Sequence, residues 1–262
     1  MDAINSIILR NNLFLQGKEF HLYYINSYTS PDYLHLYSPP LSPDELDSIN
    51  RFVFEKDRIT YTVSRGMLRY ILGHYLHIKP ENIIFSTGKY GKPFISEEQN
   101  LDNIQFNLSH SGNMIIYAIS KDRNVGIDIQ EIKENQEIAG IVEHYFSEAE
   151  IAEFAALPEE QKLNGFYSCW ARKEAFIKGT GLGLSSPLDS FTVQVKPDNC
   201  TGLLNDKKGT SWAINDICIS PGFTAAIAVE GNNHECNYLI QELHAGDISS
   251  SPGQDITIGV QL

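Results

Sequence analysis

Glu174, Lys178 and Asp128 are the residues of this 262-residue chain whose types and spacing could do chemistry. At about 100° per residue along a helix, Glu174 falls inside the apolar stripe of residues 163–178, whereas Arg172 and Lys173 fall outside it. A carboxylate that faces the interior is costly unless a cation balances it. Lys178, one turn further along, and a bound metal are the two candidate cations. A purely structural Glu–Lys pair is an equal alternative.

Asp128 lies in a segment, Val125–Gln130, in which apolar and polar residues alternate as in a half-buried strand. Asp128 and Gln130 would share one face, about 7 Å apart. Two oxygen donors at this spacing can hold magnesium when phosphate oxygens complete its coordination. Taken alone, Asp128 is more simply explained as an exposed acid on a polar sheet face.

His110 stands between Ser109 and Ser111 at the end of an expected strand, which a Ser-Gly-Asn turn connects to a returning strand over 114–119. An imidazole with neighbouring hydroxyl groups can bind a phosphate, or it can cap the turn.

A loop at residues 88–93 precedes that strand and has the sequence Gly-Lys-Tyr-Gly-Lys-Pro. Its glycines would let a ligand approach closely, and its lysines would bring positive charge to that ligand. Most loops of this composition are solvated turns.

In this order, four motifs resemble the 4′-phosphopantetheinyl transferases, specifically the large, surfactin-type branch. They are Gly91-Lys92-Pro93, Phe106–Ser111, Val125–Asp128 and Trp170–Lys178 followed by Gly181-Leu182-Gly183. The resemblance covers residues 40–230 and its motifs are specific as a set. It implies a holo-acyl-carrier-protein synthase type of reaction. Phosphopantetheine would pass from the substrate coenzyme A to a serine of an apo acyl or peptidyl carrier protein, with release of 3′,5′-ADP and with Mg²⁺ or Mn²⁺ as cofactor.

The resemblance also implies roles for single residues. The metal would be held by Asp128, Glu174 and, directly or through water, Gln130. Many relatives carry an acid at the last of these positions, so its direct coordination stays open. Coenzyme A would be bound by residues of these motifs, of the loop at 88–93 and of the helix before that loop. These residues are Arg58, Arg65, Lys89, Gly91, Lys92, Pro93, Asn107, Ser109, His110 and Lys178.

Two points of this site stay open. Arg58, Arg65 and Arg69 would form a basic stripe on one helix, from which Arg58 or Arg65 could contact the 3′-phosphate, while Arg69 is expected on a solvated face. In the reaction, the metal would neutralise charge on the pyrophosphate and Lys178 would stabilise the departing 3′,5′-ADP. Either Glu174 or a metal-bound hydroxide would take the proton of the carrier serine.

Two other classes of protein compete with this interpretation. A non-catalytic coenzyme A or carrier-binding protein would keep the phosphate contacts and lose metal ligands, and Gln130 is the feature in its favour. A magnesium-dependent phosphohydrolase would use similar acids, but the sequence has no dense acidic cluster.

An internal repeat indicates the elements that would position these residues. Ser42 with Glu45 and Ser147 with Glu150 each form a capping-box pattern before a longer helical segment. Arg65 in one longer segment and Arg172 in the other are 107 positions apart, as are Pro80 and Pro187.

We therefore expect an α+β fold of two similar halves, each with helices packed on a small antiparallel sheet. Residues 1–120 would form the nucleotide side and 121–243 would carry the metal ligands and the carrier-docking surface. Residues 244–262 would be a poorly ordered tail. A ligand would lie at the seam, and the chain would be a monomer with internal pseudo-two-fold symmetry.

A short apolar face is expected between the metal-binding strand and the second capping box. Ile138, Ile141 and Val142 recur at helical spacing in a segment that in relatives looks like part of the carrier-binding surface. The alternative is that they pack onto their own half.

Composition sets the outer limits. A net charge of −13 disfavours nucleic acid and anionic membranes as partners, and no apolar run approaches membrane-spanning length. The four cysteines are widely spaced, and the first residues do not resemble a secretory signal, so we expect a cytoplasmic protein. The pathway served, whether polyketide, nonribosomal peptide or fatty acid synthesis, is not specified.

Overall fold

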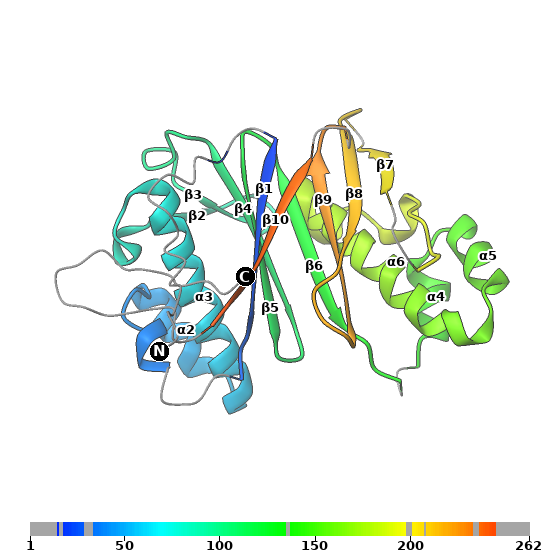
Figure 1. Ribbon diagram of the computed structural model, residues 1–262, viewed down its shortest axis with the longest axis horizontal. Helices are drawn as coiled ribbons and strands as arrows, with labels where there is room; N and C mark the ends of the chain where they lie inside the picture. The colour runs from blue at the N-terminus through cyan, green and yellow to red at the C-terminus, as the bar shows by residue number, and fades with distance from the viewer. Residues whose placement is uncertain are drawn as a thin grey trace, which may run out of the picture.

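The computed structural model describes residues 15, 18–28, 34–134, 137–197, 201–206, 208–232 and 236–244. It is an α+β fold in which two four-stranded sheets lie at the centre and helices cover their outer faces (Figure 1). The expected tail, 244–262, falls outside the described residues except for His244.

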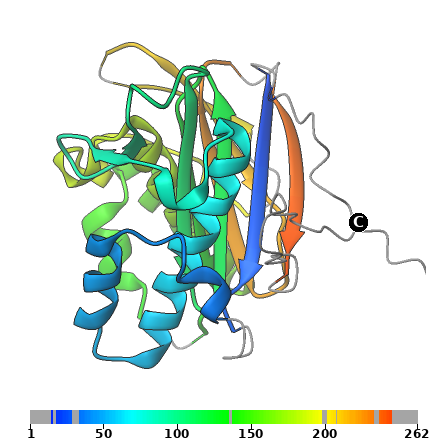
Figure 2. The same ribbon diagram turned by 90° about the vertical axis from the view of Figure 1, so that its left-hand side faces the viewer.

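The first sheet has the strand order β10-β1-β5-β4. Its strands are β1 (Glu19–Asn26), β4 (Ile104–Ser111), β5 (Met114–Lys121) and β10 (Asn237–Leu243). β1 and β4 both pair antiparallel with β5, whereas β10 runs parallel to β1 at the edge of the sheet (Figure 2). The expected second half, residues 121–243, includes β10, but the backbone of β10 pairs with β1 of the first sheet.

The second sheet has the order β6-β9-β8-β7, with all neighbours antiparallel. It comprises β6 (Val125–Glu131), β7 (Thr201–Asn205), β8 (Ser211–Ile217) and β9 (Phe223–Glu230). The strand expected from the alternation of residues 125–130 is thus confirmed. A separate hairpin of β2 (Phe85–Thr87) and β3 (Pro93–Ile95) carries the Gly-Lys-Tyr-Gly-Lys-Pro loop.

The two sheets pack face to face through alternate residues of β1 and β5 in the first sheet and of β6 and β9 in the second. Phe20 and Leu22 of β1 meet Val125, Ile127 and Ile129 of β6 in one buried cluster. The neighbouring residues of β1 and β5 point the other way, toward a helix. Because both faces of β5 are buried, its sequence is an almost unbroken apolar run.

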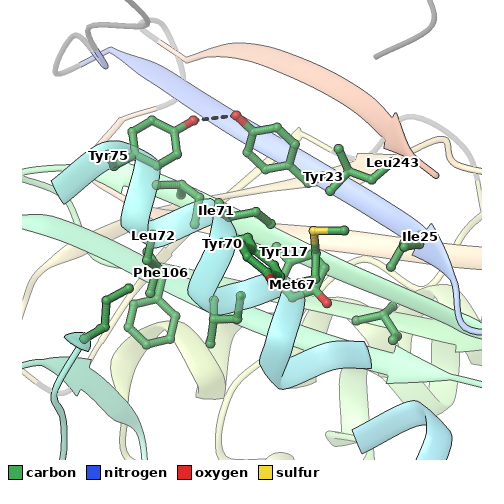
Figure 3. Packing of buried hydrophobic residues seen from close by; sticks show 14 of the residues in the cluster. Tyr23, Ile25, Met67, Tyr70, Ile71, Leu72, Tyr75, Phe106, Tyr117 and Leu243 are labelled. Atoms are coloured by element: carbon green, nitrogen blue, oxygen red, sulfur yellow. Dashed lines mark hydrogen bonds between the residues drawn. The ribbon is translucent and has the colours of Figure 1, made fainter. Parts of the chain in front are cut away.

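The long helix α3 (Glu55–Leu76) covers the outer face of the first sheet. Its residues Met67 and Ile71 lie in one buried cluster with Ile25 and Tyr117 of the sheet (Figure 3). Tyr23 and Tyr75 join this core through a hydrogen bond of 2.5 Å between their hydroxyl groups. Two shorter helices precede α3: α1 (Leu34–Tyr37) and α2 (Pro43–Arg51).

The long helix α6 (Glu159–Thr180) covers the outer face of the second sheet, preceded by α4 (Ala139–Tyr145) and α5 (Glu148–Ala156). Phe166 and Phe176 of α6 pack with Trp212 and Ala226 of the sheet. Short 3₁₀ turns follow each long helix: η2 (Pro80–Asn82) after α3, and η3 (Gly183–Ser185) and η4 (Leu188–Ser190) after α6.

One ion-pair arrangement occurs twice. Both expected capping boxes are confirmed. The capping glutamate of each short helix also forms an ion pair with a cationic side chain of the following long helix. Arg69 Nε lies 2.7 Å from Glu45 Oε2, and Lys173 Nζ lies 2.7 Å from Glu150 Oε2. Each cation also donates to two backbone carbonyls beyond its helix, those of Pro80 and Ile83 or of Leu188 and Phe191.

Three expectations about charged residues are corrected by this packing. Arg69 is 2 % exposed and not on a solvated face. Arg172 and Lys173 are 0 % exposed, although the helical stripe placed them on a polar side. Arg172 binds Asp216 through two contacts of 2.5 and 2.8 Å, so α6 is enclosed on several sides. Arg69 and Lys173, which have equivalent partners in the two arrangements, are 104 positions apart. The two long helices therefore correspond at this offset and not at the offset of 107 positions between Arg65 and Arg172.

Candidate active site

Strands β4 and β6 belong to different sheets, yet side chains of β4 join them. The amide oxygen of Asn107 accepts the backbone N–H of Ile127 at 2.8 Å, and the hydroxyl oxygen of Ser111 accepts that of Glu131 at 2.9 Å. Between them, Ser109 donates its hydroxyl to Asp128 Oδ1 at 2.8 Å. Alternate polar residues of β4 thus take the place that a neighbouring backbone would have in a continuous sheet.

Asp128 is the centre of a charged cluster where β4, β6 and α6 meet. Lys178 Nζ lies 2.5 Å from Asp128 Oδ1 and also donates to Ser109 Oγ at 2.8 Å. The Asp128 carboxylate is 2 % exposed, so the expectation of an exposed acid on a polar sheet face is wrong. It is buried because α6 packs on that face of β6, and the ammonium group compensates its charge.

Glu174 lies one helical turn before Lys178 and is half-buried. Burial and then the negative charge of Asp128 raise the pKa of Glu174 above its ordinary value, while the Lys178 ammonium opposes this shift. The two carboxylates are therefore close enough to repel each other. A cation placed between them would relieve that repulsion.

His110 follows Ser109 on β4, within range of the charges of two basic side chains. Burial, Lys178 and Arg65 lower the pKa of His110, whereas Asp128 and Asp57 raise it. The structure thus brings together His110, Arg65 and Lys178, three residues expected to bind coenzyme A. Arg65 also stacks over the Tyr61 ring, at 5.5 Å from its centre.

Gln130 shares a face with Asp128, as the alternation predicted, and its amide nitrogen donates to Asp128 Oδ2 at 2.7 Å. Both oxygens of Asp128 therefore have partners from the protein. The side chain lies beside the acid that it was expected to assist. Rotation of its amide group by half a turn would present the oxygen in place of the nitrogen.

The contact between β6 and α6 depends on two glycines that the sequence reasoning did not single out. A methyl group on Gly126 would lie 2.0 Å from the Ala175 carbonyl oxygen and 2.1 Å from the Gly179 nitrogen. Helix and strand backbones therefore touch, with Asp128 two residues along the strand and Lys178 next to Gly179. A glycine two positions before the aspartate, and another directly after the lysine, were the available signals.

Lys92 lies on the hairpin between β2 and β3, but its ammonium group points into the structure. Nζ donates to the carbonyl oxygens of Val125 at 3.0 Å and Gly179 at 2.9 Å. Burial lowers the pKa of Lys92 to about 8, against the charge of Glu230, which raises it. The structure thus gives the Lys92 side chain a partner within the protein.

The other residues expected in the ligand site lie farther out. Arg58 is exposed on α3, and Lys89 is exposed with its ammonium 5.1 Å from the centre of the Tyr90 ring. Gly91 has φ +91°, which the hairpin loop requires, and Pro93 begins β3.

The apolar residues of the segment expected to dock a carrier pack on the core between α6 and the second sheet. Val142 is buried, and Ile138 and Ile141 are partly buried against the same cluster. This is the arrangement that the alternative interpretation predicted, most clearly for Val142.

The donor set suits a hard cation. Asp128 and Glu174 supply carboxylate oxygens and Gln130 an amide oxygen, and these are the ligand types that magnesium accepts. Among the described residues, no group of three or more His, Cys, Asp or Glu side chains forms a metal site. A magnesium ion here would therefore need ligand phosphate oxygens or water, which fits a site beside the basic group of Arg65, His110 and Lys178.

These groups combine carboxylates with basic side chains, a chemistry that suits a phosphate-containing ligand together with a cation. The profile of the 4′-phosphopantetheinyl transferase superfamily matches residues 124–228, and that of the 4′-phosphopantetheinyl transferase N-terminal region matches residues 29–122.

Curated relatives agree with these matches. The chain is 32 % identical to 4′-phosphopantetheinyl transferase HetI of Nostoc over 84 % of this chain and 91 % of that protein. It is 31 % identical to 4′-phosphopantetheinyl transferase Sfp of Bacillus subtilis, over 71 % and 81 %. It is 28 % identical to the mouse L-aminoadipate-semialdehyde dehydrogenase-phosphopantetheinyl transferase, over 74 % and 70 %. The chain therefore belongs to the 4′-phosphopantetheinyl transferase superfamily, in its Sfp-type branch.

No helix among the described residues combines the length and apolar character needed to cross a membrane.

Proposed function

We propose that this protein transfers 4′-phosphopantetheine from coenzyme A to a serine of an apo acyl or peptidyl carrier protein and releases 3′,5′-ADP. The observation that carries this proposal is the cluster of Asp128, Lys178 and Glu174 beside His110, at the junction of β4, β6 and α6. It combines carboxylates for a metal with basic groups for phosphates. The family membership of the chain supports the same reaction.

Asp128 and Glu174 would hold Mg²⁺, with Gln130 as a further oxygen donor directly or through water. Bound there, the ion would neutralise charge on the pyrophosphate of coenzyme A. Burial and then the negative charge of Asp128 raise the pKa of Glu174, and the proximity of these two carboxylates supports this assignment.

The residues of the chain would act as follows. The hydroxyl oxygen of the carrier serine attacks the phosphorus atom that bears the pantetheine arm. The bond from that phosphorus to the bridging oxygen breaks, and 3′,5′-ADP leaves with the electron pair. Glu174 is the carboxylate that we propose takes the serine proton. Lys178 and His110 would hold the phosphate oxygens during this step.

We also propose how the chain is organised into halves. The repeated pairs Glu45–Arg69 and Glu150–Lys173 support two related α+β halves within one monomer, with the ligand at their junction. The half with α3 would take the nucleotide and the half with α6 would dock the carrier. The cytoplasm, where coenzyme A is available and where thiols such as Cys169 stay free, is the proposed location.

A mass-spectrometric assay tests the reaction. The protein is incubated with coenzyme A, Mg²⁺ and several apo carrier proteins, and the carriers are then weighed. A gain of one phosphopantetheine mass, lost when Mg²⁺ is chelated, supports the proposal. Binding of coenzyme A without any mass gain across the carriers would instead indicate a non-catalytic binding protein.

A further inference from the structure

The β2–β3 hairpin contacts the catalytic helix at its C-terminal end. Lys92 bridges two backbone carbonyls that belong to different elements: Val125 begins β6, and Gly179 lies in the last turn of α6. Val125 is three residues before Asp128, and Gly179 directly follows Lys178. One side chain from a separate hairpin thus joins the two elements that carry the charged cluster.

The position of the ammonium group suits the end of a helix. The last carbonyl groups of a helix have no partner within it, and the helix dipole places partial negative charge there. The Ile177 carbonyl is satisfied by the N–H of Gly181, and the Gly179 carbonyl accepts Lys92. The hairpin therefore supplies a cationic cap to α6.

The loop backbone also fits against the turn that follows α6. Gly181 and Gly183 have φ of +67° and +54°, and methyl groups on them would lie 3.3 Å from Lys92 Cδ and from the Tyr90 carbonyl oxygen. Gly181 ends α6, and both glycines leave room for residues 90–92.

We propose that Lys92 is a positioning residue, which fixes Lys178 and Glu174 relative to Asp128 by holding the end of α6 on the start of β6. This inference rests on the proposed transferase function for its catalytic consequence. It assigns to the lysine of the Gly91-Lys92-Pro93 motif a role other than direct contact with coenzyme A, because two carbonyl oxygens already accept its ammonium group.

The two roles predict different losses. A lysine that binds a phosphate of coenzyme A contributes to the affinity for coenzyme A. A lysine that holds the helix end contributes to the geometry of the reacting groups, so its loss lowers kcat and leaves binding of coenzyme A nearly unchanged.

The test compares Lys92→Met, Lys92→Arg and, as a matched control, Lys162→Met, which removes a partly exposed lysine of α6 that pairs with Glu159. Three quantities are measured: kcat with a carrier protein, the Kd of coenzyme A without carrier, and hydrogen exchange of the amides at 176–181. For Lys92→Met we expect kcat to fall about 10–100-fold, Kd to change by less than about 3-fold, and exchange at 176–181 to accelerate. Lys92→Arg should recover most of kcat, because a guanidinium group can also donate to both carbonyls. Lys162→Met should match the wild type.

A rise of Kd of about tenfold or more with unchanged kcat would assign Lys92 to coenzyme A and overturn the inference. So would exchange that accelerates throughout the second sheet with no rescue by arginine, because that result describes a general loss of stability. Failure of the wild-type protein to modify any carrier would reject the proposed function instead. The exchange measurement would still decide whether Lys92 holds α6.

Discussion

The negative charge of Asp128 is compensated by neighbouring side chains, whereas that of Glu174 is compensated less. Ser109 and Lys178 contact one oxygen of Asp128, and Gln130 contacts the other. Glu174 keeps a raised pKa because burial and the charge of Asp128 both disfavour its ionised form. A metal ion that binds both acids would therefore compete with Lys178 for Asp128 and gain most of its electrostatic advantage at Glu174.

Glu174→Gln should stabilise the metal-free protein at neutral pH while lowering transfer at least about 100-fold. The ionised acid costs more in the folded protein than in the unfolded chain, so its removal should raise Tm by about 1–2 °C. This gain should be present above the raised pKa and disappear as pH falls below the ordinary value of 4.5, where the acid is neutral in both states. Thermal unfolding across pH, with the exposed Glu143→Gln as control, measures it. An unchanged or lower Tm at pH 7 would contradict the prediction.

Gln130→Glu should lower the Mg²⁺ concentration needed for half-maximal transfer by a factor of about 3–10, because it adds a charged oxygen ligand beside Asp128. Without metal, the new acid loses the hydrogen bond of Gln130 and repels Asp128, so Tm should fall. A magnesium titration, compared with Gln161→Glu on α6, checks the shift. Equal titration curves would place Gln130 outside the metal site.

At the level of single residues, the sequence predicted which side chains of the site lie close together, but it did not predict the hydrogen-bond and ion-pair partners of the buried cations. The periodicity of β6 placed Asp128 and Gln130 together, and the helix placed Glu174 near Lys178. The helical stripe failed for Arg172 and Lys173, because it assumes that a helix has one buried side. Buried cations with carbonyl and carboxylate partners break that assumption, and those partners lie 15 to 44 residues away in sequence.

At the scale of elements, β6 and α6 approach each other closely at Gly126. Gly126→Ala should cost about 2–4 kcal/mol in the free energy of unfolding, because the neighbouring atoms belong to a helix backbone that cannot move aside. Gly140→Ala in α4 is the control, since no atom lies within 4 Å of its added methyl group. It should stabilise by up to about 1 kcal/mol. Urea unfolding measures both, and equal effects would contradict the close packing of β6 on α6.

Elements themselves could be predicted better than their contacts. Both capping boxes, the α6 helix, β6 and the Ser-Gly-Asn turn after β4 follow from local rules. The side-chain links from β4 to β6 could not be predicted, because an Asn or Ser on a strand also fits a solvated face. Only the tertiary neighbour decides between these outcomes.

At the scale of the molecule, the charge of −13 acts on an acidic partner. If the carrier protein is also acidic, salt should screen a net repulsion between the two proteins and not a net attraction. The kcat/KM for an acidic carrier should therefore stay constant or rise about 2–3-fold from about 50 to about 300 mM NaCl at fixed Mg²⁺. A tenfold fall over this range would instead reveal attraction at a basic docking patch.

Because β10 pairs with β1, the first sheet can be completed only late in synthesis of the chain. Ribosomes make chains from the N-terminus, and more than 200 residues separate Asn26 from Asn237. Every strand of the second sheet has been synthesised before the edge strand of the first sheet emerges. The flank of β1 that β10 covers must stay unpaired until then, a state that invites pairing with another nascent chain. We expect this protein to depend on chaperones during synthesis more than its size alone would suggest.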